Sequence, residues 1–253
     1  QSYLEDYSSA ISEFENVKNG NLKYLNNSLG CAYDNLKSFD KAENYFRKEI
    51  ENNGNISSAY SNLIRLLYQQ GETNELKQLL ADEKTNQYFS FHIKRSMYFN
   101  DAQLGDYFTL LLTWIFSGIN IFGFLAALII MIIWILYLRR LDIFEKEKWS
   151  NIILTVMLGM VFSILTFPLS DFNKWVLGFD LNGEFVNDFL YCVLGIGAIE
   201  EFVKIVPLLI MLKFTRGIDE PFDYIKYASL SALGFAFVEN LIYFDEGSLQ
   251  IIH

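Results

Sequence analysis

The sequence has few of the residues on which several common kinds of site depend. It contains two cysteines and two histidines, which excludes a disulfide framework and a metal site built from three histidines. It has no His-Glu-x-x-His helix and no glycine-rich phosphate loop. Cys31 and Cys192 are therefore expected to be small buried residues.

Basic clusters are also missing. The 20 Lys and Arg residues are outnumbered by 30 Asp and Glu residues, which gives a formal net charge of −10. Because nucleic acid is bound through concentrated positive charge, the sequence argues against a nucleic-acid partner.

Long uncharged runs are present, and they lie in only one part of the chain. Residues 107–138 and 149–170 contain no Asp, Glu, Lys or Arg. A helix of about 20 such residues crosses a hydrocarbon core of about 30 Å. The sequence therefore predicts a soluble module followed by a membrane module.

The soluble module contains a repeat. Tyr7, Ala10 and Phe14 recur 32 residues later as Phe39, Ala42 and Phe46. With Leu29, Gly30 and Tyr33 before the second copy, residues 23–56 resemble a tetratricopeptide repeat, and residues 57–83 resemble a degenerate one. The resemblance implies that Gly30 and Ala42 lie where two helices touch. We expect helical repeats over 1–83, then a helix and linker over 84–106.

Such an array favours a groove for a protein or peptide partner, and a spacer without a ligand is the alternative.

The membrane module is expected to cover 107–253 with at least four helical spans, so the predicted fold class is all-α. The spans are placed at about 110–138, 149–170, 189–212 and 225–244, with a polar loop at 171–188. Basic residues gather in two of the loops, 139–148 and 213–226, and they are Arg139, Arg140, Lys146, Lys148, Lys213, Arg216 and Lys226. The positive-inside rule then makes these loops cytoplasmic and the repeats extracytoplasmic.

Four charged residues inside the apolar segments are the main functional candidates, namely Glu200, Glu201, Lys204 and Glu239. A charge at mid-membrane costs about 2.5–3.5 kcal/mol on insertion scales, so such residues face protein or water. Glu200 and Lys204 are four residues apart, the spacing of a helical ion pair. Counting from the span ends places Glu200 and Glu239 at the same depth. A hydrolase, a transporter and a purely structural ion cluster are all compatible with this pattern.

Two motifs resemble those of the PrsW family of intramembrane proteases. Glu200-Glu201-Phe202-Val203-Lys204 matches the Glu-Glu-x-x-Lys motif of that family, and residues 235–240 match its Phe-x-x-x-Glu-Asn motif. The sequence Glu220-Pro221-Phe222-Asp223 before the fourth span is similar as well. The resemblance covers about 107–253.

The resemblance implies a polytopic endopeptidase that cleaves a membrane-anchored protein similar to an anti-sigma factor. Glu200 or Glu201 would activate water, Lys204 would anchor that pair, and Glu239 with Asn240 would orient water or stabilise the oxyanion. A divalent metal such as zinc, held by Glu200, Glu201 and Glu239, is one alternative. A mechanism that uses glutamate alone is the other.

One family motif, a His-x-x-x-Asp element on a later span, is missing. His253 comes too soon after the fourth span to supply it, so the sequence is expected to stop short at its C-terminus and to be inactive in this form. The second hypothesis for the whole chain is a non-enzymatic membrane receptor or scaffold that binds a partner through its repeats. In either case we expect a multi-pass protein of a bacterial inner membrane, with the lipid bilayer around it.

Overall fold

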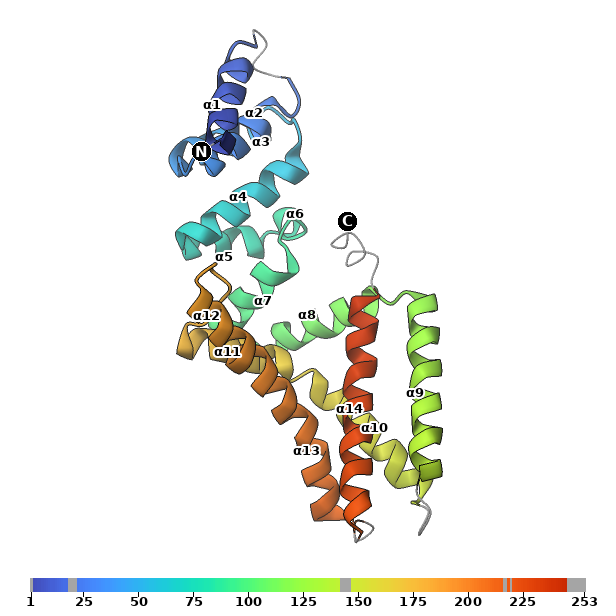
Figure 1. Cartoon of the computed structure of the whole chain (residues 1–253). Helices are drawn as coiled ribbons and strands as arrows, with labels where there is room; N and C mark the ends of the chain where they lie inside the picture. Colours follow the sequence, from blue (N-terminus) through green and yellow to red (C-terminus); the bar gives the residue numbers. More distant parts are fainter. Residues whose placement is uncertain (1, 18–21, 142–146, 216–217, 219, 245–253) are drawn as a thin grey trace. The chain divides into compact units, whose positions relative to one another are not determined.

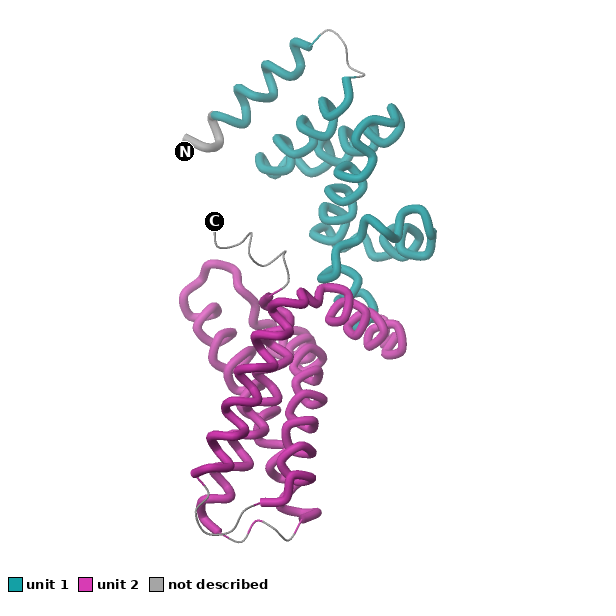
Figure 2. Tube along the Cα trace, turned by 90° about the vertical axis from the view of Figure 1, so that its right-hand side faces the viewer, with its two compact units in different colours: residues 1–100 teal, residues 101–253 magenta. Residues whose placement is uncertain are grey.

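The computed structural model describes all residues except 1, 18–21, 142–146, 216–217, 219 and 245–253. The described residues form helices and loops without a strand, which confirms the predicted all-α class. The chain divides into two compact units between Asn100 and Asp101, and Figure 2 colours each unit separately.

Unit 1 contains the residues predicted to form repeats, and its helices pack in sequence order. The helices are α1 (Ser2–Glu15), α2 (Leu25–Asn35), α3 (Phe39–Glu51), α4 (Ile56–Gln70), α5 (Thr73–Ala81), α6 (Glu83–Asn86) and α7 (Phe91–Asn100). Ala42 is fully buried, and a Cβ atom added at Gly30 would overlap the Phe46 ring. The small residues therefore lie at the contact between α2 and α3, while the tetratricopeptide class itself stays a prediction.

A buried carboxylate links three segments of unit 1. Glu49 is 1% exposed and accepts hydrogen bonds from the backbone N–H groups of Tyr24 (2.8 Å), Asn27 (3.3 Å) and Asn55 (2.7 Å). These donors lie at the beginnings of α2 and α4, where helical N–H groups have no partner within the helix. Glu49 thus satisfies two helix termini at once, and its charge is favourable there.

Unit 2 is a bundle of long helices with a shorter helix at one end (Figure 1). Its elements are α8 (Leu104–Ser117), α9 (Ile121–Leu141), α10 (Trp149–Ser163), α11 (Thr166–Leu177), α12 (Phe185–Leu190), the π-helix η1 (Tyr191–Gly197), α13 (Ala198–Phe214) and α14 (Pro221–Tyr243). Helix α14 packs against α9, α10 and α13, so it is the central helix of the bundle.

Two helix boundaries differ from the predicted spans. The first predicted span, 110–138, is split into α8 and α9 because the Asn120 side chain accepts a hydrogen bond from the N–H of Phe122 (2.9 Å) and starts a new helix there. The second span is interrupted at residues 164–165, and α11 then extends to Leu177, into the first part of the predicted polar loop 171–188. Pro168 lies in the first turn of α11, where its missing N–H costs no helical hydrogen bond.

Two described helical segments are long and apolar enough to cross a membrane, namely Ile121–Leu141 and Trp149–Leu177. The apolar residues of α9 are largely exposed, among them Ile129, Ile133 and Leu136, which suits a lipid-facing surface. Cys192 is exposed rather than buried as expected. That η1, α13 and α14 also lie in the bilayer, in a multi-pass arrangement, stays a prediction.

The contact between α10 and α14 is made through glycine. A Cβ atom added at Gly159 would overlap the carbonyl oxygen of Ser231, and one added at Gly234 would overlap that of Val156. The two backbones therefore touch directly at this level. Either side chain would force them apart, because backbone atoms cannot move aside as a flexible side chain can.

We predict that Gly234→Ala lowers the free energy of unfolding of unit 2 by about 1–3 kcal/mol, the usual cost of overpacking. The measurement is thermal unfolding of the purified protein in detergent. Gly105→Ala is the matched control, because a Cβ atom there meets no atom within 4 Å. Equal stability of the two variants would contradict the glycine contact.

We predict that Glu49→Gln weakens the start of both α2 and α4. The amide lacks the charge and presents one oxygen instead of two, so N–H groups lose their partner at a cost of about 1–3 kcal/mol. Hydrogen exchange at Tyr24, Asn27 and Asn55 should accelerate by about tenfold or more, since about 1.4 kcal/mol corresponds to tenfold. Glu51→Gln, at an exposed position on the same helix, should leave these rates unchanged. Equally fast exchange of these amides in the Glu51→Gln variant would contradict the role given to Glu49.

Candidate active site

The predicted glutamate–lysine cluster forms on α13. The Nζ atom of Lys204 lies 3.3 Å from Oε2 of Glu200 and 2.9 Å from Oε1 of Glu201. Spacings of four and three residues bring both carboxylates to the same ammonium on the helix surface. The Glu201 side chain is 72% exposed, whereas those of Glu200 and Lys204 are largely covered.

Helix α14 holds Lys204 from the other side. The Lys204 ammonium lies 4.6 Å from the centroid of the Phe235 ring, a cation–π distance. One turn earlier, the Ser231 hydroxyl donates a 2.6 Å hydrogen bond to the Lys204 carbonyl oxygen. The contacts of Lys204 with Phe235 and Ser231 fix the level at which α13 meets α14. Pro207 lies within one turn of Lys204 on α13.

These contacts also determine where Glu239 lies. Because α13 and α14 run antiparallel and Lys204 is level with Ser231, Glu200 is level with Phe235, about one turn from Glu239. Cα–Cβ bonds tilt toward the N-terminus of a helix, so the Glu200 and Glu239 side chains lean toward each other across that turn. The Glu239 charge interacts with those of Glu200 and Lys204. Counting residues from the span ends had instead predicted that Glu200 and Glu239 lie at the same depth.

Glu239 borders a cavity of about 220 Å³. Its carboxylate accepts no hydrogen bond from any residue that the structure describes. The other lining residues come from α8, α10, α11 and α14, and they are Trp114, Ser163, Thr166, Phe167, Phe235, Val238, Ile242 and Tyr243. Phe235 is therefore shared between the cavity and the Lys204 cluster. Sequence reasoning missed this cavity, because its walls come from three stretches that are far apart in the sequence, at 114, 163–167 and 235–243.

Asn240 is not joined to this arrangement within the described chain. Asn240 is half-buried on α14, and its side chain makes no hydrogen bond within the described chain. His253, Lys146 and Arg216 lie outside the described residues.

A second ionic cluster, absent from the predicted site, lies at the opposite end of α14. Lys226 is 1% exposed, and its Nζ atom lies 2.9 Å from Asp223 and 3.8 Å from Glu147. The Tyr227 hydroxyl donates to Glu147 at 2.7 Å. These contacts bring the two basic loops to one end of the bundle. The signal in the sequence is the three-residue spacing of Asp223 and Lys226, which suits an ion pair on one helix face.

The comparisons with known proteins agree with the motif-based resemblance. Residues 147–251 match the family model described as PrsW family intramembrane metalloprotease. The matched range contains Glu200, Lys204 and Glu239, and it supports the assignment of this segment to that family. Together with the two apolar segments, the match indicates a membrane protein with an intramembrane protease domain. No curated protein and no solved structure matches the chain.

The family description is compatible with a divalent metal, but the described side chains do not fit one as they are arranged. No three His, Cys, Asp or Glu residues among them converge in a way that could hold an ion. One oxygen of Glu200 and one of Glu201 contact the Lys204 ammonium, whose positive charge repels a cation. We therefore derive no chemical step through a metal.

Proposed function

We propose that this chain is an intramembrane endopeptidase that hydrolyses a membrane-anchored protein with glutamate as the acid–base group. The observation that carries the proposal is the pairing of two unlike carboxylate environments. Glu200 and Glu201 share the ammonium of Lys204, while Glu239 faces a cavity without a hydrogen-bond partner in the described chain. An unpaired carboxylate beside a cavity is poorly explained by a purely structural ion cluster.

The proposed reaction needs one base and one group that stabilises negative charge. A carboxylate of the pair Glu200–Glu201 takes a proton from a water molecule, and the oxygen of that water bonds to the peptide carbonyl carbon. The Lys204 ammonium offsets the negative charge that develops nearby. Glu239, with Asn240, orients the water. The carboxyl group then returns the proton to the leaving nitrogen as the C–N bond breaks.

The substrate in this proposal is a membrane-anchored protein of the anti-sigma-factor kind, and the helical repeats of unit 1 bind a peptide or protein partner on the extracytoplasmic side. The proposal further places the chain as a multi-pass protein in a bacterial inner membrane.

We predict that Glu200→Gln and Glu201→Gln in the full-length protein reduce cleavage by at least about 100-fold, the lower end of the contribution of a positioned acid–base group. Glu239→Gln should act similarly because the attacking water loses its orientation, and the amount of membrane-inserted protein should not change. The readout is the appearance of new N-termini among the membrane proteins of cells that produce each variant. Glu184→Gln, at an exposed loop position, is the control. Full activity in all three site variants would exclude this site.

We predict that a thiol on unit 1 is accessible from outside intact cells. Asn44 is exposed on α3, so Asn44→Cys can be labelled with a membrane-impermeant maleimide. Background from Cys31 should be low, because burial raises the pKa of that thiol and only the thiolate reacts. Cys192 is replaced by serine in all samples. Labelling that occurs only after lysis would reverse the proposed orientation.

A further inference from the structure

The cavity at Glu239 has the size of one side chain. At about 220 Å³ it is somewhat larger than the apolar cavity of about 150 Å³ known to hold benzene. It is smaller than the sites of about 300–1,000 Å³ that enclose whole small molecules. A phenyl or isobutyl group would therefore fit inside it.

The cavity walls are suited to an apolar group. Ser163 and Thr166 are the lining residues with aliphatic hydroxyls, and each donates a 2.7 Å hydrogen bond to a backbone carbonyl oxygen one turn back, that of Met160 and Ser163 respectively. Their protons are therefore already used. Most of the remaining surface is aromatic or aliphatic, so a polar occupant would lose hydrogen bonds on entry.

Polarity is concentrated at Glu239. An occupant with an apolar end and a polar end would place the polar end there, beside a carboxylate whose charge interacts with Glu200 and Lys204. A residue of a peptide chain has this character, because its side chain is apolar while its backbone carries N–H and C=O groups.

We infer that this cavity receives a large apolar side chain of the substrate, next to the peptide bond that is cleaved. The inference rests on the proposed function and specifies which sequences the protein cleaves. A substrate side chain that enters the cavity would hold the adjacent peptide bond of the substrate beside Glu239.

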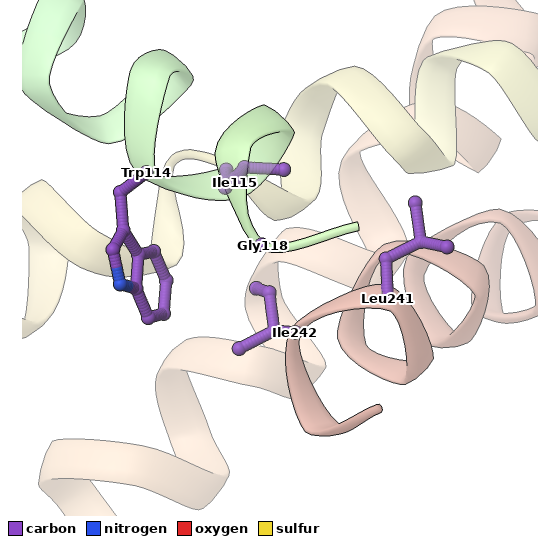
Figure 3. A pocket seen from close by; sticks show the side chains of 5 residues that line it. All are labelled: Trp114, Ile115, Gly118, Leu241 and Ile242. Carbon is purple, nitrogen blue, oxygen red and sulfur yellow. The ribbon is translucent and has the colours of Figure 1, made fainter. Parts of the chain in front are cut away.

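Two residues determine the size of the cavity. Trp114 of α8 and Ile242 of α14 border both this cavity and a smaller one of about 10 Å³ beside it, and Figure 3 shows the two side chains on facing helices, with the indole ring beside Ile242. Helix α8 is held in place by a 2.7 Å hydrogen bond from Tyr107 to Asp171 and by the edge contact of Trp114 with Phe167.

The test changes the cavity in opposite directions and compares the cleaved sequences. Membrane proteins are taken from cells that produce the full-length protein, and their new N-termini are sequenced. Only the cleavage sites that disappear in the Glu239→Gln variant are included in the comparison. We expect Leu, Phe or Met at one fixed position beside the cleaved bond of these sites. Ile242→Trp, which fills the cavity, should reduce cleavage at sites with a large apolar residue in that position by about tenfold or more. Cleavage at any sites with Ala or Gly in that position should persist.

Trp114→Ala should shift the preference toward larger residues, including Trp. Trp114→Leu is the milder substitute if the alanine variant does not accumulate. Trp134→Ala is the matched control, because Trp134 is exposed on α9 and does not border the cavity. It should leave the preference unchanged.

The outcomes separate this inference from the proposed function. Sites that depend on Glu239 but show no positional preference, or a preference that neither cavity variant alters, would overturn the inference and leave the protease proposal intact. An equal loss at all sites in both cavity variants would indicate a lipid chain or a structural role, and would also overturn it. If no site depends on Glu239, the proposed function fails and the inference fails with it.

Discussion

The close approach of α10 and α14, where Gly159 lies against the Ser231 backbone and Gly234 against that of Val156, is the constraint on which the rest of unit 2 depends. It brings the backbones of α10 and α14 together, so the position of α14 is set by backbone atoms rather than by side chains that can adjust. Phe235 follows directly and meets both Lys204 and the cavity, and Glu239 follows one turn later. A small displacement of α14 would therefore change the ion cluster and the cavity together. Small residues allow this close approach of the two backbones, and the gain comes from dispersion contacts between them.

The two ionic clusters on α14 differ in how completely they are satisfied. At the Pro221 end, Lys226 is buried between Asp223 and Glu147, and Glu147 also accepts from Tyr227. That cluster joins loops and has little capacity left for a ligand. At the other cluster, Glu201 is exposed and Glu239 faces a cavity. Buried charge alone is therefore a poor guide to chemistry. The Lys226 cluster, which was not predicted, is the more deeply buried of the two and the less suited to a reaction.

The sequence predicted the features that depend on local spacing. Glu200, Glu201 and Lys204 meet because they are three and four residues apart on one helix. The helix contact at Gly30 and Ala42 was implied by the resemblance of residues 23–56 to a tetratricopeptide repeat. Features that depend on contacts between distant segments were not predictable. The run 107–138 is uncharged throughout, and only the side-chain bond of Asn120 shows that it is two helices. The cavity requires Trp114, Phe167 and Ile242 from three helices, and the offset between Glu200 and Glu239 requires knowing that Ser231 pairs with Lys204.

The π-helix η1 has a consequence for how the glutamates are aimed. Residues 185–214 form one uninterrupted helical path through α12, η1 and α13, but in a π-helix each N–H bonds to the fifth preceding residue instead of the fourth. Such a segment accommodates an extra residue, and one residue corresponds to about 100° of rotation in an α-helix. The exposed aromatic side chains of Phe185 and Phe189 and the carboxylates of α13 thus follow two different angular phases. In this helix, the direction in which Glu200 points relative to Phe185 and Phe189 depends on the number of residues in the wide turn between them.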